Sequence, residues 1–214
     1  MKTRFFEESA VELTDLFAEL AEPGYFAVIP SFKIPAAKVK FNGEDIETPE
    51  FETPETKLHC IHNKDCKHYL LFDNCLFNMP IVPFKNDKEI CFKNSFLKKY
   101  LKKVFLPAFL KAVNLNPEFK IKCDILSKVE VFGASEESDE GQLDWFKEPK
   151  HKIAMNTNCS DWWWLSDYIK SYDEDDRASS ANFAFVSDDG GAYCYDASYA
   201  HTYVRPRFVI ERKA

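Results

Sequence analysis

Three stretches of the chain decide its fold: CSDWWWLSD (159–167), FAFVSDDGGAY (183–193) and YVRPRFVI (203–210). Strand alternation places Trp162 and Trp164 on one face and Trp163 on the other. We expect at least two of these large rings to pack in the core. A third can stay exposed and stack on a sugar ring or a partner side chain. The residues DDGG at 188–191 predict a tight turn between two strands.

The preceding half of the chain alternates between helical and extended patterns. Ser9 and Glu12 form a capping box that predicts a helix ended by Pro23 and Gly24. The apolar face of this helix would hold Val11, Leu13, Leu16, Phe17 and Leu20. Residues 25–29 then predict a strand. The acidic stretch 42–57 (NGEDIETPEFETPETK) has little periodicity, so we expect an exposed excursion or loop there.

Alternation over 58–76 predicts a hairpin that turns at residues 63–65. Asn94 or Ser95 should cap a helix, and Pro107 should end that helix or open a short second one through residue 113. The apolar side of the first helix comprises Phe96, Leu97, Tyr100, Leu101 and Val104. Residues 120–126 predict a strand, followed by a short segment at 129–133. A polar loop interrupted by Trp145 and Phe146 is expected over 134–150.

Several of these stretches carry a resemblance to a known group of proteins. FLKKYLKKVF (96–105), CDILSKVEVFG (123–133), DWWWLSD (161–167), the strand–turn–strand at 183–196 and the final VRP motif occur in that order. This order resembles an uncharacterised bacterial and phage domain family with a WWLRSP…VRPAL-type C-terminus. That family is similar to C-type lectins, and more distantly to formylglycine-generating and sulfatase-modifying proteins and to ligand-displaying proteins diversified by phage retroelements. Leu165, Ser166 and Asp167 replace the LRSP pattern, so the role of its arginine is not carried over.

The resemblance implies an α+β fold, with a C-type-lectin-like mixed sheet, flanking helices and long loops. It covers residues 58–214, while residues 1–57 would form an N-terminal helix and strand elaboration with an acidic loop, together one compact unit. Pro206 should lie at a strand start or a bulge. Strand alternation places Arg205 and Arg207 on one strand face. For Arg205, which precedes the proline, the resemblance implies a structural ion pair with Asp161 or Asp167, and this is favoured over an anion-binding role.

Composition narrows the class of partner and the compartment. A net charge of -7 argues against nucleic-acid binding through a broad basic face. No apolar run reaches the length of a membrane span, and the first twenty residues lack the apolar core of a signal peptide. Seven cysteines without a framework spacing favour reduced thiols. We therefore expect a cytoplasmic protein, or a virion component assembled in the cytoplasm.

The His and Cys residues at 59–68 allow two interpretations. Cys60, His62, Cys66 and His68 could meet across the hairpin as a Cys2His2 zinc site. A hairpin with core cysteines and solvent-facing histidines is the favoured alternative, so no cofactor is expected. The acidic run 173–176 offers calcium ligands, but it is more typical of a solvated loop. The common nucleophile, zinc-protease, phosphate-loop and dinucleotide motifs are missing from the sequence, which favours a protein that is not an enzyme.

Tyrosines interleaved with small polar residues at 193–203 are typical of an adaptable binding surface. The candidate ligand-binding residues are Trp163, Tyr195, Tyr199, His201 and Tyr203. The sequence thus predicts a non-catalytic binding protein that recognises a protein or a glycan through loops at 134–150, 167–182 and 193–203. The alternative is a phage-encoded inhibitor of a host protein, which would act through the acidic segments 44–55, 136–140 and 173–176.

Overall fold

The computed structural model describes residues 9–13, 22–64, 67–84, 90–114, 120–135, 140–156, 159–170 and 181–211. Within these ranges the strands form two large sheets and three two-stranded ribbons, and the helices are short. The architecture is therefore α+β. No helix in this part of the chain is long and apolar enough to cross a membrane.

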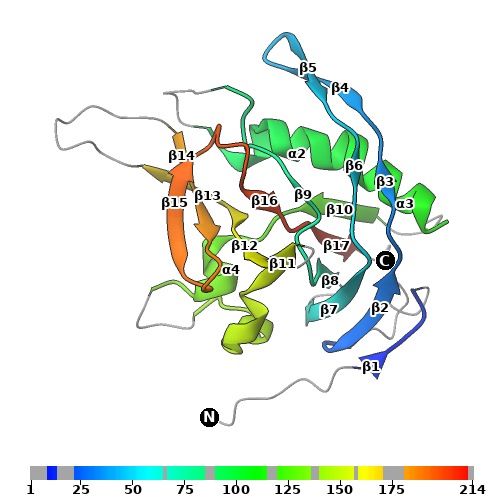
Figure 1. Cartoon of the computed structure of the whole chain (residues 1–214). Helices are drawn as coiled ribbons and strands as arrows, with labels where there is room; N and C mark the ends of the chain where they lie inside the picture. Colours follow the sequence, from blue (N-terminus) through cyan, green and yellow to red (C-terminus); the bar gives the residue numbers. More distant parts are fainter. Residues whose placement is uncertain are drawn as a thin grey trace.

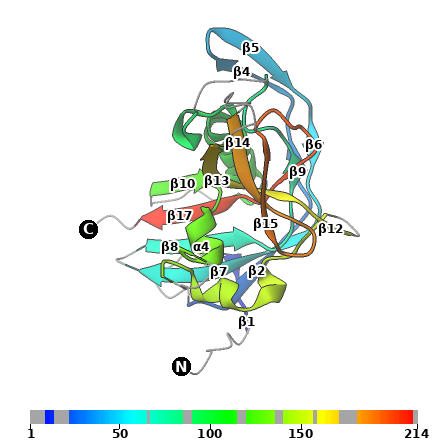
Figure 2. The ribbon, with the colours of Figure 1, turned by 90° about the vertical axis from the view of Figure 1, so that its left-hand side faces the viewer.

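The larger sheet has six strands, which Figure 2 shows side by side from β10 to β2. β1 is parallel to β2, and the other neighbours are antiparallel. In spatial order the strands are β1 (Ser9–Ala10), β2 (Tyr25–Ile29), β7 (Thr56–Lys64), β8 (Lys67–Phe72), β17 (Arg207–Glu211) and β10 (Lys120–Asp124).

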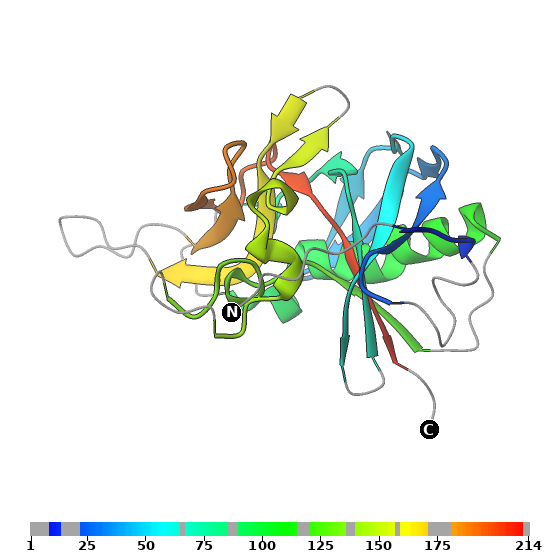
Figure 3. The same ribbon diagram turned by 90° about the horizontal axis from the view of Figure 1, so that it is seen from below.

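The second sheet has five strands. Figure 3 shows its strands β14 and β15 (orange) on the opposite side of the molecule from the blue strands of the N-terminal part of the chain. Its spatial order is β15 (Ala192–Asp196), β14 (Ala181–Val186), β13 (Trp163–Lys170), β16 (Tyr203–Val204) and β9 (Phe77–Asn78). The ribbons pair β3 (Lys33–Ile34) with β6 (Phe51–Glu52), β4 (Ala37–Phe41) with β5 (Glu44–Thr48), and β11 (Ala154–Asn156) with β12 (Cys159–Asp161).

One continuous helix packs on a face of the six-stranded sheet. It consists of α2 (Phe96–Tyr100), a π-helical turn η2 (Leu101–Phe105) and α3 (Leu106–Ala112). Ser95 caps it as predicted, because its hydroxyl accepts from the N–H of Lys98 at 3.1 Å. Pro107 has no N–H to donate to the helix, yet the helix continues through it. The wider π turn directly before α3 accommodates this missing hydrogen bond. Phe105 and Phe109 then reach Phe72 and Phe208 on the sheet.

A second layer covers the opposite face of this sheet. It contains α4 (Lys128–Phe132) and two short 3-10 helices, η3 (Asp144–Lys147) and η4 (Pro149–His151); a third, η1 (Phe92–Asn94), precedes α2. Trp145 and Phe146 are buried here with Leu71, so they anchor a segment that the sequence predicts only as a polar loop. The core has two clusters: the first includes Phe72, Phe105 and Phe208, and the second includes Leu71, Trp145 and Phe146. The tryptophans divide between them as predicted, since Trp164 lies in the first cluster and Trp163 in the second, while Trp162 packs against the first.

The chain crosses from one sheet to the other at Arg205 and Pro206. β16 belongs to the five-stranded sheet, and β17 lies in the six-stranded sheet between β8 and β10. Pro206 stands just before β17, so its missing N–H breaks no ladder bond, as the sequence predicts.

The structure corrects one local prediction and defines two others. Ser9 lies in strand β1, opposite Tyr25, so the predicted helix does not begin there; most of that helix lies outside the described residues. The acidic stretch 42–57 is mostly exposed, as predicted, but it contains strands β5 and β6, since β5 pairs with lysine-bearing β4 and Lys38 reaches Glu47 at 2.9 Å. The hairpin β4–β5 projects from the top of the molecule in Figure 1. Residues 128–132 form helix α4, which Ser127 and Glu130 close with a capping box.

Candidate functional site

Strand β15 is the outer strand of the five-stranded sheet, at the left margin of Figure 1. Its ladder with β14 runs without a register shift from the pair Asn182–Asp196 to the pair Val186–Ala192. Tyr193 is 57% exposed and Tyr195 is 45% exposed. Both side chains lie on the strand face that also carries Phe183 and Phe185 of β14, since these are their cross-strand partners.

The segment after β15 folds back against Tyr195. Its ring centroid lies 4.6 Å from that of Tyr199, and Tyr199 lies 5.3 Å from His201. Asp196 fixes this return, because its carboxylate accepts from the N–H of Ser198 at 2.8 Å and its main-chain oxygen accepts from the N–H of Tyr199 at 3.0 Å. The structure therefore brings together Tyr195, Tyr199 and His201, three of the predicted ligand-binding residues.

A row of stacked rings continues this surface. Trp162 stacks on Phe185 at 4.9 Å between centroids, and Phe185 stacks on Tyr193 at 5.9 Å. Trp162 Nε1 donates to the carboxylate of Asp188 at 3.3 Å. We call the surface formed by Trp162, Tyr193, Tyr195, Tyr199 and His201 the aromatic edge. Trp162 and Tyr193 were not among the predicted ligand-binding residues, although strand alternation relative to Trp163 and Tyr195 identifies both.

The turn at 188–191 holds Tyr193 close to the backbone. Ser187 and Gly191 bond through the main chain at 2.9 Å, and the Asp189 carboxylate accepts from the N–H of Gly191 at 2.9 Å. Hydrogen bonds from the Ser187 hydroxyl and from the Gly191 N–H lower the pKa of Asp189. A Cβ at Gly191 would stand 2.9 Å from the Tyr193 ring, so this close approach requires glycine.

Two predicted ligand-binding residues do not belong to the aromatic edge. Trp163 has no exposed surface, and its Nε1 donates to the main-chain oxygen of Lys152 at 2.9 Å. Because a fully buried ring cannot stack on a ligand, Trp163 is a core residue. Tyr203 pairs with Trp163 in the parallel β13–β16 contact, and it packs half-buried against the second core cluster. It therefore lies on the opposite face from Tyr195.

Arg205 has a structural role, as the resemblance implies, but with other partners, and Arg207 has a structural role as well. Arg205 is buried and donates to the main-chain oxygens of Phe72 at 2.7 Å and His151 at 2.8 Å. Arg207 donates to Asp124 at 2.8 Å and pairs with Glu130 of α4. Neither Asp161 nor Asp167 is a partner, because the crossing between the sheets directs these side chains to distant strands. The pKa of Arg205 is lowered by burial.

The predicted His and Cys cluster is only partly described, since Cys66 lies outside the described residues. Cys60 is buried, and its thiol approaches Oδ1 of Asn63 at 3.3 Å. Burial raises the pKa of Cys60 to about 12. His59 and His68 are also buried, which corrects the expectation of solvent-facing histidines. In the described ranges no three potential ligands converge as a metal site, and the acidic run 173–176 falls outside them.

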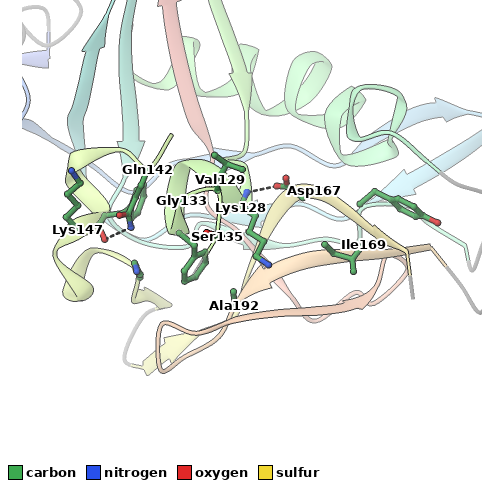
Figure 4. A pocket seen from close by; sticks show the side chains of 14 residues that line it. Lys128, Val129, Gly133, Ser135, Gln142, Lys147, Asp167, Ile169 and Ala192 are labelled. Atoms are coloured by element: carbon green, nitrogen blue, oxygen red, sulfur yellow. Dashed lines mark hydrogen bonds between the residues drawn. The ribbon is translucent and has the colours of Figure 1, made fainter. Parts of the chain in front are cut away.

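A pocket of about 800 Å³ opens between α4, η3 and the sheet face opposite to the aromatic edge. Figure 4 shows the side chain of Lys128 extending from α4 toward Ala192 of β15. We call this hollow the lysine pocket; its lining includes Lys128, Phe132, Gln142, Phe146, Lys147, Lys152, Asp167, Ile169 and Ala192. Sequence reasoning missed it, because its walls come from five separate stretches of the chain.

Among the described lining residues of the lysine pocket, three carry ammonium groups and one carries a carboxylate. Lys147 pairs with Asp144 at 2.8 Å, and Lys152 lies 4.7 Å above the ring of Phe132. Asp167 accepts from the N–H of Lys128. Burial raises the pKa of Asp167, and the hydrogen bond from Lys128 opposes this shift. The lysines outnumber the carboxylate, so the lining favours an anionic group.

Comparison with known proteins identifies one domain. A family model described as a domain of unknown function (DUF6273) matches residues 114–212. No curated protein and no solved structure matches the chain. The matched segment contains the aromatic edge and the whole lining of the lysine pocket. Both candidate sites therefore belong to the DUF6273-like part of the chain.

Proposed function

We propose that this chain is a non-catalytic binding protein that recognises its ligand through the aromatic edge. The observation that carries the proposal is the exposure of Tyr193 and Tyr195 on an edge strand, beside the half-buried Trp162. Tyrosine supplies a large contact area at low cost in conformational entropy, and Trp and Tyr are enriched where binding energy is concentrated.

The rings of the aromatic edge are held before any ligand arrives. Trp162 and Tyr193 are fixed by stacking on Phe185, and Tyr199 is fixed by the turn at Asp196. A pre-ordered contact surface loses less entropy on binding. The geometry therefore favours recognition of a planar or extended apolar ligand surface.

A C-type-lectin-like fold is part of this proposal. In that fold two terminal strands lie near the middle of a sheet, and loops carry the binding surface. The interior place of the C-terminal strand β17, between β8 and β10, and the location of Tyr199 and His201 in a connection between strands both support it.

The alternative, inhibition of a host protein through acidic loops, has less support from the described residues. Glu47 of the acidic segment 44–55 pairs with Lys38, and Asp45 lies opposite Lys40. This pairing offsets part of the negative charge of the projecting hairpin. Strong weakening of a captured complex by salt would favour the alternative.

The test is affinity capture with two variants in parallel. The tagged wild type, a Tyr193→Ser/Tyr195→Ser variant and a Phe84→Ser control are offered bacterial cytosol, envelope fractions and a glycan array. Phe84 is 52% exposed but lies outside the aromatic edge, so its replacement matches the loss of exposed ring surface. The proposal expects a ligand that the wild type and the control retain and the double variant loses. Equal retention by all three proteins would contradict it.

A further inference from the structure

The backbone of β15 directs hydrogen-bonding groups to a side on which no other described strand pairs with it. Main-chain bonds from Ser187 to Gly191 and from Ala197 to Ala181 fix the parity of the β14–β15 ladder. Residues 193 and 195 therefore bond inward to β14, and the N–H and C=O groups of Ala192 and Cys194 point outward. Among the described residues, no main-chain group pairs with these four outward groups.

Strand β15 carries no proline, lysine or bulge, and its one charged residue, Asp196, lies at its end and accepts hydrogen bonds from Ser198. Natural edge strands carry proline, lysine or a bulge that prevents the pairing of another strand. The five residues of β15 read AYCYD, and their register with β14 is continuous. The nearest bulge lies in β13, between Trp164 and Tyr168. The edge is therefore regular enough to accept a further antiparallel or parallel strand.

The two faces of β15 define the side chains that such a strand would need. On one face, residues beside Tyr193 and Tyr195 would pack against the aromatic edge. On the other face, residues beside Ala192 would be directed toward the lysine pocket, whose lining includes Ala192 itself. Neighbouring strands lie about 4.8 Å apart, so an acidic side chain there is within reach of Lys128. Alternation then requires apolar and acidic residues at every second position.

We infer that β15 accepts an extended segment of a partner protein as an additional strand of the five-stranded sheet. The segment alternates apolar side chains, against Tyr193 and Tyr195, with acidic side chains over the lysine pocket. This inference rests on the proposed function and names its ligand as a protein strand rather than a glycan. The acidic character of the partner segment follows from charge complementarity. The described lining of the pocket carries three lysines, Lys128, Lys147 and Lys152. The opposing carboxylates are two, Asp167 in the lining and Asp144 beside Lys147.

The first experiment is selection from a displayed library of random peptides of about ten residues, the length of a long strand. Selection on the full-length wild type should enrich peptides that alternate apolar with acidic residues. N-methylation of the selected peptides should abolish binding at alternate positions only, because one edge of a strand pairs with β15. Failure to enrich such peptides, or indifference to N-methylation, would overturn the inference.

The second experiment uses a matched pair of variants. Cys194→Pro removes an outward N–H without breaking a bond to β14, whereas Cys194→Ala keeps that N–H. The selected peptides should bind Cys194→Ala as they bind wild type, and bind Cys194→Pro at least about tenfold more weakly. Lys128→Glu should weaken acidic peptides similarly, with less effect on peptides whose acidic residues are replaced by glutamine.

The outcomes separate this inference from the proposed function. Loss of peptide binding in Tyr193→Ser/Tyr195→Ser with full binding by Cys194→Pro would leave the aromatic edge as the site and refute strand addition. Glycan binding that depends on the tyrosines, with no peptide enriched, would do the same. A dimer of the wild type that Cys194→Pro dissociates would assign the edge to a second copy, and would also overturn the inference.

Discussion

Arg205 donates a hydrogen bond from Nη1 to the main-chain oxygen of His151 at 2.8 Å, although 54 residues separate the two in sequence. The same guanidinium lies 5.1 Å from the Trp163 ring centre and bonds to Phe72 of β8. One buried cation therefore joins the six-stranded sheet, the η4 turn and the Trp163 side of the five-stranded sheet.

Replacement of Arg205 by methionine should destabilise the protein strongly. The variant keeps an apolar stem but leaves the carbonyls of Phe72 and His151 without donors, which costs about 2–5 kcal/mol in total. Urea denaturation followed by tryptophan fluorescence measures the change in the free energy of unfolding. Lys38→Met is the control, since the Lys38–Glu47 pair is exposed and its loss should have no measurable effect. Equal stability of Arg205→Met and wild type would refute the bridging role.

Trp162 and Trp164, which flank Trp163, should respond differently to replacement by alanine. Trp164 is fully buried and donates to the main-chain oxygen of Met79 at 2.9 Å, so Trp164→Ala should lower the free energy of unfolding by about 3–5 kcal/mol. Trp162 is half-buried at the aromatic edge, so Trp162→Ala should cost less stability and instead weaken binding of the selected peptides. Urea denaturation and peptide titration together give both quantities. A larger stability loss for Trp162→Ala would contradict this assignment.

Thiol reactivity should divide the cysteines by burial. Of the five whose side chains are described, Cys91 and Cys194 are exposed, whereas Cys60, Cys75 and Cys123 are buried. Burial raises the pKa of Cys60 and Cys75 to about 12, so their thiolate fraction is very small at about pH 8. In a background with Cys66 and Cys159 replaced by serine, a disulfide reagent should modify two thiols rapidly. Cys194→Ala should reduce this number to one, and rapid modification of all five would contradict the buried core.

Acid should destabilise the protein through His151. Its ring stacks on Trp145 at 3.9 Å, and burial lowers its pKa, although the bond to the Trp145 carbonyl opposes this effect. The unfolded chain therefore takes up this proton first. Stability should be complete above the ordinary histidine pKa, about 6.5, and should fall as the pH drops from there toward the lowered folded-state pKa. His151→Gln should reduce the dependence of the free energy of unfolding on pH in this window. Urea denaturation of the variant and the wild type at several pH values measures the difference.

Gly191→Ala should alter the aromatic edge without unfolding the protein. The added methyl would meet the Tyr193 ring at 2.9 Å and the Asp189 carboxylate at 3.0 Å, so the exposed ring must move. Peptide affinity should fall several-fold, while the melting temperature stays close to that of wild type. Gly43→Ala is the control, since its added methyl meets no atom within 4 Å and lies in the β4–β5 turn, outside the aromatic edge and the lysine pocket. Unchanged peptide affinity in Gly191→Ala would show that the position of the Tyr193 ring does not affect peptide binding.

The local sequence pattern was sufficient to predict structure where residues contact close neighbours in the chain. Alternation alone separated Trp163 from Trp162 and Trp164, and the cap at Ser95 and the hairpin β7–β8 follow from neighbouring residues. The tyrosines at 195 and 199 share a surface because a short turn joins them.

Pairing between segments that are distant in sequence determined the features that the local sequence pattern could not predict. Ser9 joins a strand because β2 lies beside it, and this pairing overrides the capping box. Tyr203 turns away from Tyr195 because β16 pairs with β13 at Trp163. The lysine pocket needs α4 to cover the sheet, and α4 is held there by the pairing of Arg207 with Glu130.

The place of β17 between β8 and β10 has a consequence for the order in which the protein assembles. Both neighbours of β17 precede it in the chain, and β10 pairs with β17 alone in this sheet. A nascent chain that has emerged only as far as Pro206 would therefore hold four strands with an open edge at β8, and β10 without its partner strand. Residues 207–211 join them in one late, long-range step, which makes the early intermediate a natural substrate for chaperones.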